Sequence, residues 1–137
     1  MSQKAKTLVA LDVGEKRIGV AVGDTGVRIA IPMTTLNVDG SEVREIAELV
    51  IREGAETIVV GYPRNQSGEP TAQTAYVERF AEQLKDIAVI EFQDESLTSV
   101  HAEERLKSYG KPYEKAEIDA QAAALILQDY LEINYAA

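Results

Sequence analysis

The chain has 137 residues, of which 45% are hydrophobic, and this combination fits one domain with a substantial apolar core. Cysteine is absent and His101 is the single histidine, which excludes disulfides, thiolate metal sites and zinc clusters built on imidazoles. The net charge of −9 argues against a protein that coats nucleic acid through a general basic field, although an enzyme with a local basic rim stays possible. No apolar run approaches the ~18 residues of a membrane span, and we expect a cytoplasmic protein.

The first third of the sequence predicts three consecutive strands. Two apolar segments, residues 7–13 and 18–23, are separated by four residues that include Gly14, which is the spacing of a β-hairpin. Residues 28–33 predict a third strand after a turn in which Asp24 is the turn-forming residue. Short turns between consecutive strands predict an antiparallel meander.

Strands and helices then alternate. In chain order we expect a helix between an N-cap at Ser41 and Gly54, a buried strand at 57–61, a helix from Thr71, a strand at 87–92, a helix from Thr98 and a last helix from about Glu114 to the early 130s. The order βββαβαβαα predicts parallel crossovers appended to an antiparallel start. We therefore predict one α/β domain over residues 1–137, with a five-stranded mixed sheet flanked by helices.

Three carboxylates lie at the ends of these predicted elements. Asp12 ends the first strand, Glu95 lies just past the fifth strand, and Asp119 lies in the first turns of the last helix. Ligands collect at the carboxyl ends of parallel strands, so the three side chains could converge there. Converging carboxylates without histidine or cysteine suit Mg²⁺ or Mn²⁺, and a pair of such ions about 4 Å apart can hydrolyse a phosphodiester.

Each carboxylate also has an ordinary structural explanation. Asp12 could form a hairpin turn, Glu95 could be a solvated loop acid, and Asp119 could be stabilised by the helix dipole. For each residue alone the ordinary explanation is favoured. The functional interpretation depends on all three occurring together at the correct element ends.

Four segments carry a resemblance to a known family. They are LDVGEKRIGVA (11–21), VGYPRNQSG (60–68), DESLTS (94–99) and IDAQAAALIL (118–127). In this order they resemble the YqgF family, also called RuvX, whose members are described as Holliday junction resolvases and pre-16S rRNA nucleases. The resemblance covers essentially the whole chain and implies an RNase H-like fold, in agreement with the order of elements.

The resemblance implies roles for the same three carboxylates. Asp12 matches the strand-one acid of the family, Glu95 the acid of its Asp-Glu-Arg-Leu segment, and Asp119 the acid of its C-terminal helix. Two positions depart from the family pattern. Ser96 replaces an arginine that could contact phosphate, which puts the strength of substrate binding in doubt, and Tyr62 replaces a leucine, where its ring could pack or stack on a base.

Basic and polar residues near these segments are candidates for binding phosphate. The candidates are Lys16, Arg17, Arg64, Asn65, Lys111 and Lys115. The alternative for the lysines is a solvated charged face, and for Asn65 a plain turn.

The expected function is a metal-dependent nuclease that acts on RNA at the 5′ end of the 16S rRNA precursor, as a monomer or weak homodimer without membrane contact. Resolution of branched DNA is the first alternative, and it would need a symmetric dimer to cut two strands. A phosphotransferase of the actin and sugar-kinase class is less favoured, because 137 residues supply one such unit where that fold uses two. A non-catalytic partner in ribosome assembly or transcription is the remaining alternative, and the acidic charge favours it somewhat.

Overall fold

The computed structural model describes residues 4–63, 69–95 and 98–135. The elements are β1 (Thr7–Val13), β2 (Arg17–Asp24), β3 (Ala30–Asn37), α1 (Glu42–Glu53), β4 (Thr57–Tyr62), α2 (Ala72–Glu82), β5 (Val89–Asp94), α3 (Thr98–Ser108) and α4 (Lys115–Tyr135). The order predicted from the sequence is confirmed. In these ranges, no helix combines the length and the apolar character needed to cross a membrane.

The five strands form one mixed sheet in the order β3-β2-β1-β4-β5. β1 pairs antiparallel with β2 and parallel with β4, and β4 pairs parallel with β5. The carboxyl ends of β1, β4 and β5 therefore meet at one edge of the sheet. In the β1–β2 ladder, Asp12 lies opposite Gly19.

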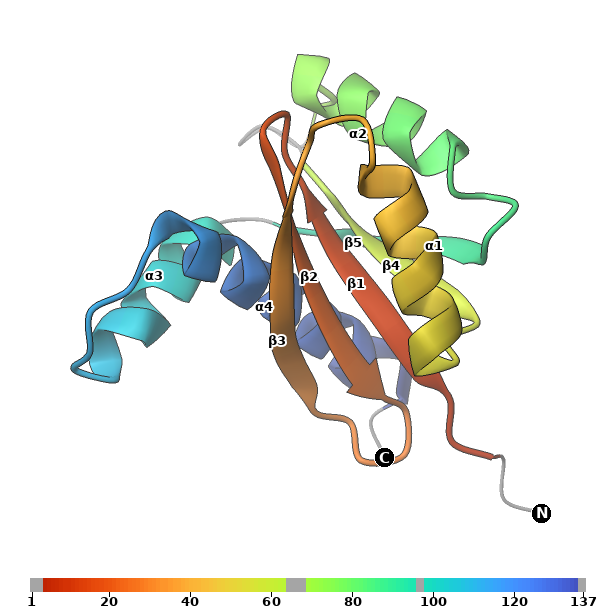
Figure 1. Ribbon diagram of the computed structural model, residues 1–137. Coiled ribbons are helices and arrows are strands. Elements are labelled where there is room, and N and C mark those ends of the chain that lie inside the picture. Colours follow the sequence, from red (N-terminus) through yellow and green to blue (C-terminus); the bar gives the residue numbers. More distant parts are fainter. Residues whose placement is uncertain (1–3, 64–68, 96–97, 136–137) are drawn as a thin grey trace.

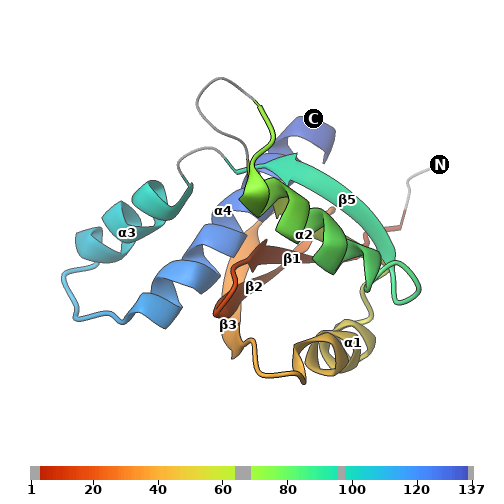
Figure 2. The same ribbon diagram turned by 90° about the horizontal axis from the view of Figure 1, so that it is seen from above.

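Helices cover both faces of the sheet, with α1 and α2 on one face and α4 on the other, where α3 lies beside α4 (Figures 1 and 2). Side chains of β1 alternate between these layers, since Val9 and Leu11 belong to the core under α1 and α2, whereas Leu8 and Ala10 belong to the core under α4. The same alternation turns Asp12 toward α4. We call the two sides of the sheet the α1/α2 face and the α4 face.

The third strand begins later and runs further than the predicted residues 28–33. Arg28 adopts a left-handed backbone conformation with φ of 63°, and its N–H donates to the carbonyl of Asp24 at 2.7 Å, which prolongs the turn. The side chain of Gln128 in α4 then accepts from the N–H of Ala30 at 2.9 Å and donates to the carbonyl of Arg28 at 3.0 Å. Strand pairing begins at Ala30, opposite Gly23.

The fifth strand is also displaced from its predicted range of 87–92. The N–H of Ile87 donates to the carbonyl of Leu84 at 2.9 Å, so the chain continues in helical turns after α2. Pairing with β4 begins at Val89, opposite Thr57. Because the strand extends to Asp94, it ends immediately before Glu95.

The limits of α1 agree with the predicted signals in one respect and differ in another. Gly54 ends the helix in the left-handed conformation, with φ of 68°. Ser41 precedes the helix as predicted, but its hydroxyl donates to the carboxylate of Asp39 at 2.6 Å and does not cap the helix. Asp24 forms the predicted turn, since its carboxylate accepts from the N–H of Val27 at 2.8 Å.

Candidate active site

Two of the three predicted carboxylates lie in contact at the carboxyl ends of the parallel strands. Asp12 comes from the end of β1, and Glu95 directly follows β5. Their side chains share a hydrogen bond. Gly61, on β4 between them, leaves the space that Glu95 occupies, because a β-carbon at position 61 would lie 2.5 Å from Glu95 Oε2. A glycine within a strand thus makes room for a functional side chain.

Burial keeps this pair of carboxylates partly protonated. Burial raises the pKa of Asp12 to about 6, and the negative charge of Asp119 adds to the rise, although the hydrogen bond from Glu95 opposes it. The pKa of Glu95 is raised to about 8. Burial is the largest cause of this rise, and the charge of Asp12 and the hydrogen bond between the two groups add to it. Near neutral pH the pair therefore shares a proton, as two carboxylates in one partly buried site commonly do.

The third carboxylate, Asp119, comes from the first turns of α4. The helix approaches β2 at Gly19, where a β-carbon would lie 1.9 Å from the carbonyl oxygen of Asp119. The hydroxyl of Thr35 on β3 donates to the carbonyl of Ala116 at 2.5 Å and ties the start of the helix to the sheet. Asp119 Oδ2 accepts a hydrogen bond from Arg17 Nε at 2.6 Å.

The site contains the oxygen ligands of a hard divalent cation, but they are not gathered into one cluster. In the part of the chain that the structure describes, no three His, Asp or Glu side chains are close enough together to hold a single metal ion. Asp12 and Glu95 fit such an ion chemically, because a cation could replace the proton that they share. Asp119 is near enough to act on the pKa of Asp12, yet its carboxylate is engaged by Arg17.

The predicted phosphate-binding residues fall into three groups. Lys16 and Arg17, at the β1–β2 turn, line a pocket of about 370 Å³ whose other lining residues are Gly14, Glu15, Gln73 and Asp119. Lys111 and Lys115 are exposed, Lys111 between α3 and α4 and Lys115 at the first position of α4. Arg64 and Asn65 lie outside the described residues.

Three residues that shape the site did not stand out in the sequence. Gly19 and Gly61 are embedded in apolar strands and were predicted only as parts of those strands. Isolated glycines in strands are the signal that could have revealed them, because they mark close approach of another group. Gln73 carried no such signal. Its side-chain amide donates to the carbonyl of Val13 at 3.1 Å, which connects α2 to the end of β1.

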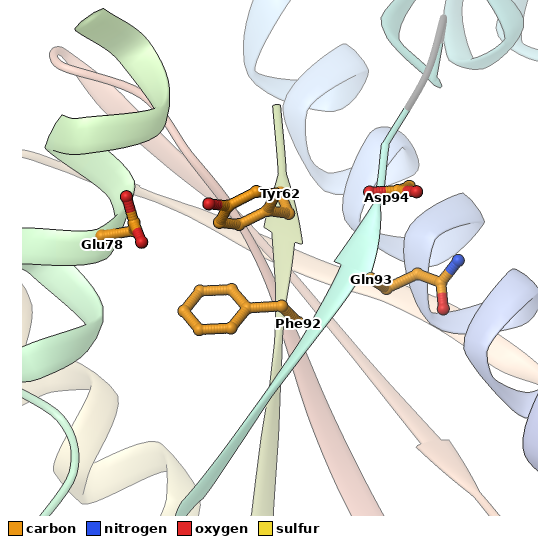
Figure 3. A pocket seen from close by; sticks show the side chains of 5 residues that line it. All are labelled: Tyr62, Glu78, Phe92, Gln93 and Asp94. Carbon is orange, nitrogen blue, oxygen red and sulfur yellow. The ribbon is translucent and has the colours of Figure 1, made fainter. Parts of the chain in front are cut away.

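Tyr62 packs against a neighbouring aromatic ring. Its ring meets that of Phe92 edge to face, with centroids 5.2 Å apart and planes at 70°. Figure 3 shows both rings beside Glu78 of α2, and the three residues line a pocket of about 440 Å³ together with Gln93 and Asp94. Since the alternation along β4 turns Ile58 and Val60 to the α1/α2 face, Tyr62 lies on the opposite face from Asp12.

Comparisons of the sequence identify related proteins. The family model described as "RuvX: Holliday junction resolvase" matches residues 6–133. A protein of Chloroflexus aurantiacus with the name "Putative pre-16S rRNA nuclease" is 47% identical over 131 residues, which cover 91% of this chain and 86% of that protein. A protein of Chloroflexus aggregans with the same name is 44% identical, over 93% of this chain and 94% of the relative.

Solved structures with a similar fold include resolvases. Thermus thermophilus RuvC in complex with a Holliday junction substrate superimposes with a TM-score of 0.56 at 16% identity, over 93% of this chain and 94% of that chain. The fowlpox virus resolvase in complex with Holliday junction DNA superimposes with a TM-score of 0.52 at 11% identity, over 93% and 97% of the two chains. At these identities the likeness concerns the fold, and it confirms the RNase H-like architecture.

Proposed function

The chain belongs to the RuvX family, and on this premise we propose that it is a metal-dependent nuclease that hydrolyses phosphodiester bonds in the precursor of 16S rRNA. The observation that carries the proposal is the partly buried Asp12–Glu95 pair beside Asp119. Burying two carboxylates in contact is unfavourable unless a proton or a cation compensates their charge. Structural stability alone does not call for such a pair, whereas cation binding does.

Asp12, Glu95 and Asp119 are the residues that would hold Mg²⁺ or Mn²⁺. A bound ion of this kind would activate a water molecule and stabilise the leaving oxygen of the phosphodiester. The chain itself supplies the other requirements. Arg17 and Lys16 border the pocket next to Asp119, where they can neutralise a backbone phosphate. Lys115 lies one helical turn before Asp119 and can extend this basic rim along α4.

RNA is the proposed substrate because the relatives at 44% and 47% identity are named for pre-16S rRNA, whereas the resolvase structures are 16% identical or less. Cleavage at the 5′ end of the precursor, in the cytoplasm, is the proposed role. Branched DNA is the second candidate, favoured by the description of the family model. A monomer or weak homodimer suffices for RNA, whereas cutting both strands of a junction needs two active sites related by symmetry.

One cleavage assay tests the proposal and separates the two substrates. A 16S precursor fragment and a four-way DNA junction are each incubated with the protein, with and without Mn²⁺. We expect cleavage of the RNA that requires Mn²⁺ and falls about 100-fold or more in Asp12→Asn, Glu95→Gln and Asp119→Asn. Glu48→Gln is the matched control, because it makes the same chemical change at an exposed position on the α1/α2 face.

Three results would overturn parts of the proposal. Cleavage without added metal in the presence of a chelator would exclude metal dependence. Equal cleavage by the wild type and the three carboxylate variants would exclude the site. An absence of cleavage for both substrates, with Asp12→Asn indistinguishable from the wild type in cells, would favour the non-catalytic ribosome-assembly alternative.

A further inference from the structure

The Arg17–Asp119 ion pair occupies the carboxylate that the proposed metal site needs. Arg17 Nε lies 2.6 Å from Asp119 Oδ2, so the guanidinium and the carboxylate are in direct hydrogen-bond contact. The side chains of Arg17 and Asp119 are 37% and 23% exposed, so both partners remain within reach of water and ligands. An ion pair of this exposure is weak enough to exchange for a competing partner.

In the proposed metal site, Arg17 and a divalent cation would compete for the carboxylate of Asp119. While Asp119 is bound to Arg17, the described residues contain no assembled group of three carboxylates. Release of Asp119 would make a third carboxylate available near Asp12, whose pKa its charge already raises. With Asp119 engaged by Arg17, only Asp12 and Glu95 of the three would be available to a cation.

A phosphate is the group that could release Asp119 from Arg17. The pocket of about 370 Å³ at the β1–β2 turn is lined by both members of the ion pair and by Lys16. A guanidinium binds phosphate through two parallel hydrogen bonds, and Lys16 would add a second positive charge. A backbone phosphate in this pocket would thus attract Arg17 away from Asp119.

We propose that Arg17 is a positioning residue that holds Asp119 until a nucleic-acid phosphate enters this pocket. The phosphate takes the guanidinium, and Asp119 becomes available to complete a cation site with Asp12 and Glu95. The inference rests on the proposed nuclease function. It adds that binding of the nucleic-acid substrate promotes binding of the metal ion. By thermodynamic linkage, metal binding favours substrate binding to the same extent.

The first test measures Mn²⁺ binding to the protein without nucleic acid, by electron paramagnetic resonance of the free ion. Arg17→Gln removes the cation that engages Asp119, and we expect it to tighten Mn²⁺ binding about 5-fold or more. Lys16→Gln is the matched control, because it removes one positive charge from the adjacent position and leaves the ion pair intact. In Arg17→Gln/Asp119→Asn the gain disappears, because the carboxylate that was released is absent.

The second test measures RNA binding in a metal chelator, where no cleavage occurs. Asp119→Asn frees Arg17 for phosphate. We therefore expect this variant to bind a single-stranded RNA oligonucleotide at least about 5-fold more tightly than the wild type does. Glu117→Gln is the matched control, since it removes one negative charge from an exposed position of the same helix. The gain disappears when Arg17→Gln is added to Asp119→Asn.

The outcomes separate this inference from the nuclease function. The inference fails if Arg17→Gln binds Mn²⁺ no tighter than Lys16→Gln does. It also fails if Asp119→Asn binds RNA no tighter than Glu117→Gln does. In either case Arg17 does not restrain Asp119, even if the wild type cleaves RNA. If neither the wild type nor any variant binds Mn²⁺, the metal-dependent function and this inference both fail. Far-ultraviolet circular dichroism and urea denaturation establish that each variant is folded, and Arg17→Lys, which keeps the charge, should bind Mn²⁺ more like the wild type than Arg17→Gln does.

Discussion

The carbonyl oxygen of Asp119 lies so close above Gly19 that a β-carbon at that position would be 1.9 Å from it. We predict that Gly19→Ala destabilises the protein by about 3 kcal/mol or more, because backbone must move to relieve the overlap. Gly61→Ala is the matched comparison on the same face. Its β-carbon would meet the ends of two flexible side chains, Glu95 Oε2 at 2.5 Å and Ile126 Cδ1 at 2.6 Å, so about 1–2 kcal/mol is expected. Urea denaturation measures both, and equal losses would contradict the close backbone approach.

Gly61→Ala should slow RNA cleavage strongly while the protein remains folded. The added methyl group displaces the carboxylate of Glu95 from its place beside Asp12. We expect a folded protein whose RNA cleavage is about 100-fold slower, similar to the loss in Glu95→Gln. Cleavage rates and denaturation curves on the same preparation measure the two effects. Full activity in a folded Gly61→Ala protein would show that Glu95 can act from another position.

The stability of the metal-free protein should fall as pH rises from about 4 to about 8. Asp12 and Glu95 have pKa values of about 6 and about 8, above their ordinary values of 3.8 and 4.5, so the folded state binds more protons than the unfolded state in this window. Losing those protons therefore weakens the fold, with a total effect on the order of a few kcal/mol. Denaturation at a series of pH values in a chelator measures this slope.

Asp12→Asn should flatten this pH dependence and stabilise the protein near pH 8, because Asn carries no charge and no longer raises the pKa of Glu95. Glu48→Gln, which removes an exposed carboxylate, should retain the slope of the wild type. If stability instead rises with pH through this window in the wild type, the two carboxylates are not held partly protonated in the folded state.

Gln128 should contribute to stability through the start of β3. Its amide joins the N–H of Ala30 and the carbonyl of Arg28, and Gln128→Ala would leave both groups without this partner. We predict a loss of about 1–2 kcal/mol, against less than about 0.5 kcal/mol for Gln83→Ala at an exposed position. Gln128→Glu keeps the acceptor and loses the donor, so its loss should be intermediate. Urea denaturation of the three variants measures the difference.

The parts of the fold that depend on local patterns could be predicted from the sequence. Alternating and helical periods located the elements in the correct order, and Gly54 marked the end of α1 where the structure has it. The start of β3 was wrong because a side chain from α4, Gln128, decides where pairing begins, about 100 residues away in sequence. Local residues carry no sign of such a contact.

In the candidate site, too, the features set by local sequence could be predicted and those set by long-range packing could not. Asp12 and Glu95 were expected together because the carboxyl ends of parallel strands meet, and the structure brings them into contact. The ion pair between Arg17 and Asp119 joins residues 102 positions apart, so its formation depends on how α4 lies across the sheet. Local periodicity does not determine that packing, and Arg17 was therefore predicted only as a phosphate ligand.

The two layers of the core differ in composition. On the α1/α2 face the buried core cluster of the described residues contains branched aliphatic residues and Phe80 but no alanine, whereas on the α4 face alanines such as Ala10, Ala21 and Ala123 stand among the larger residues and let the helix lie close to the sheet. Both sides of the sheet therefore hold the fold together, and the proposed chemistry lies on the α4 side alone. Substitutions under α1 and α2 should act mainly on how much folded protein a cell contains, while those under α4 should act on both stability and chemistry, because that helix carries Asp119 and also packs Leu127 and Leu131 into the core. Natural variants under α1 and α2 should then be almost entirely losses of abundance, whereas losses of catalysis at normal abundance should fall on the α4 side.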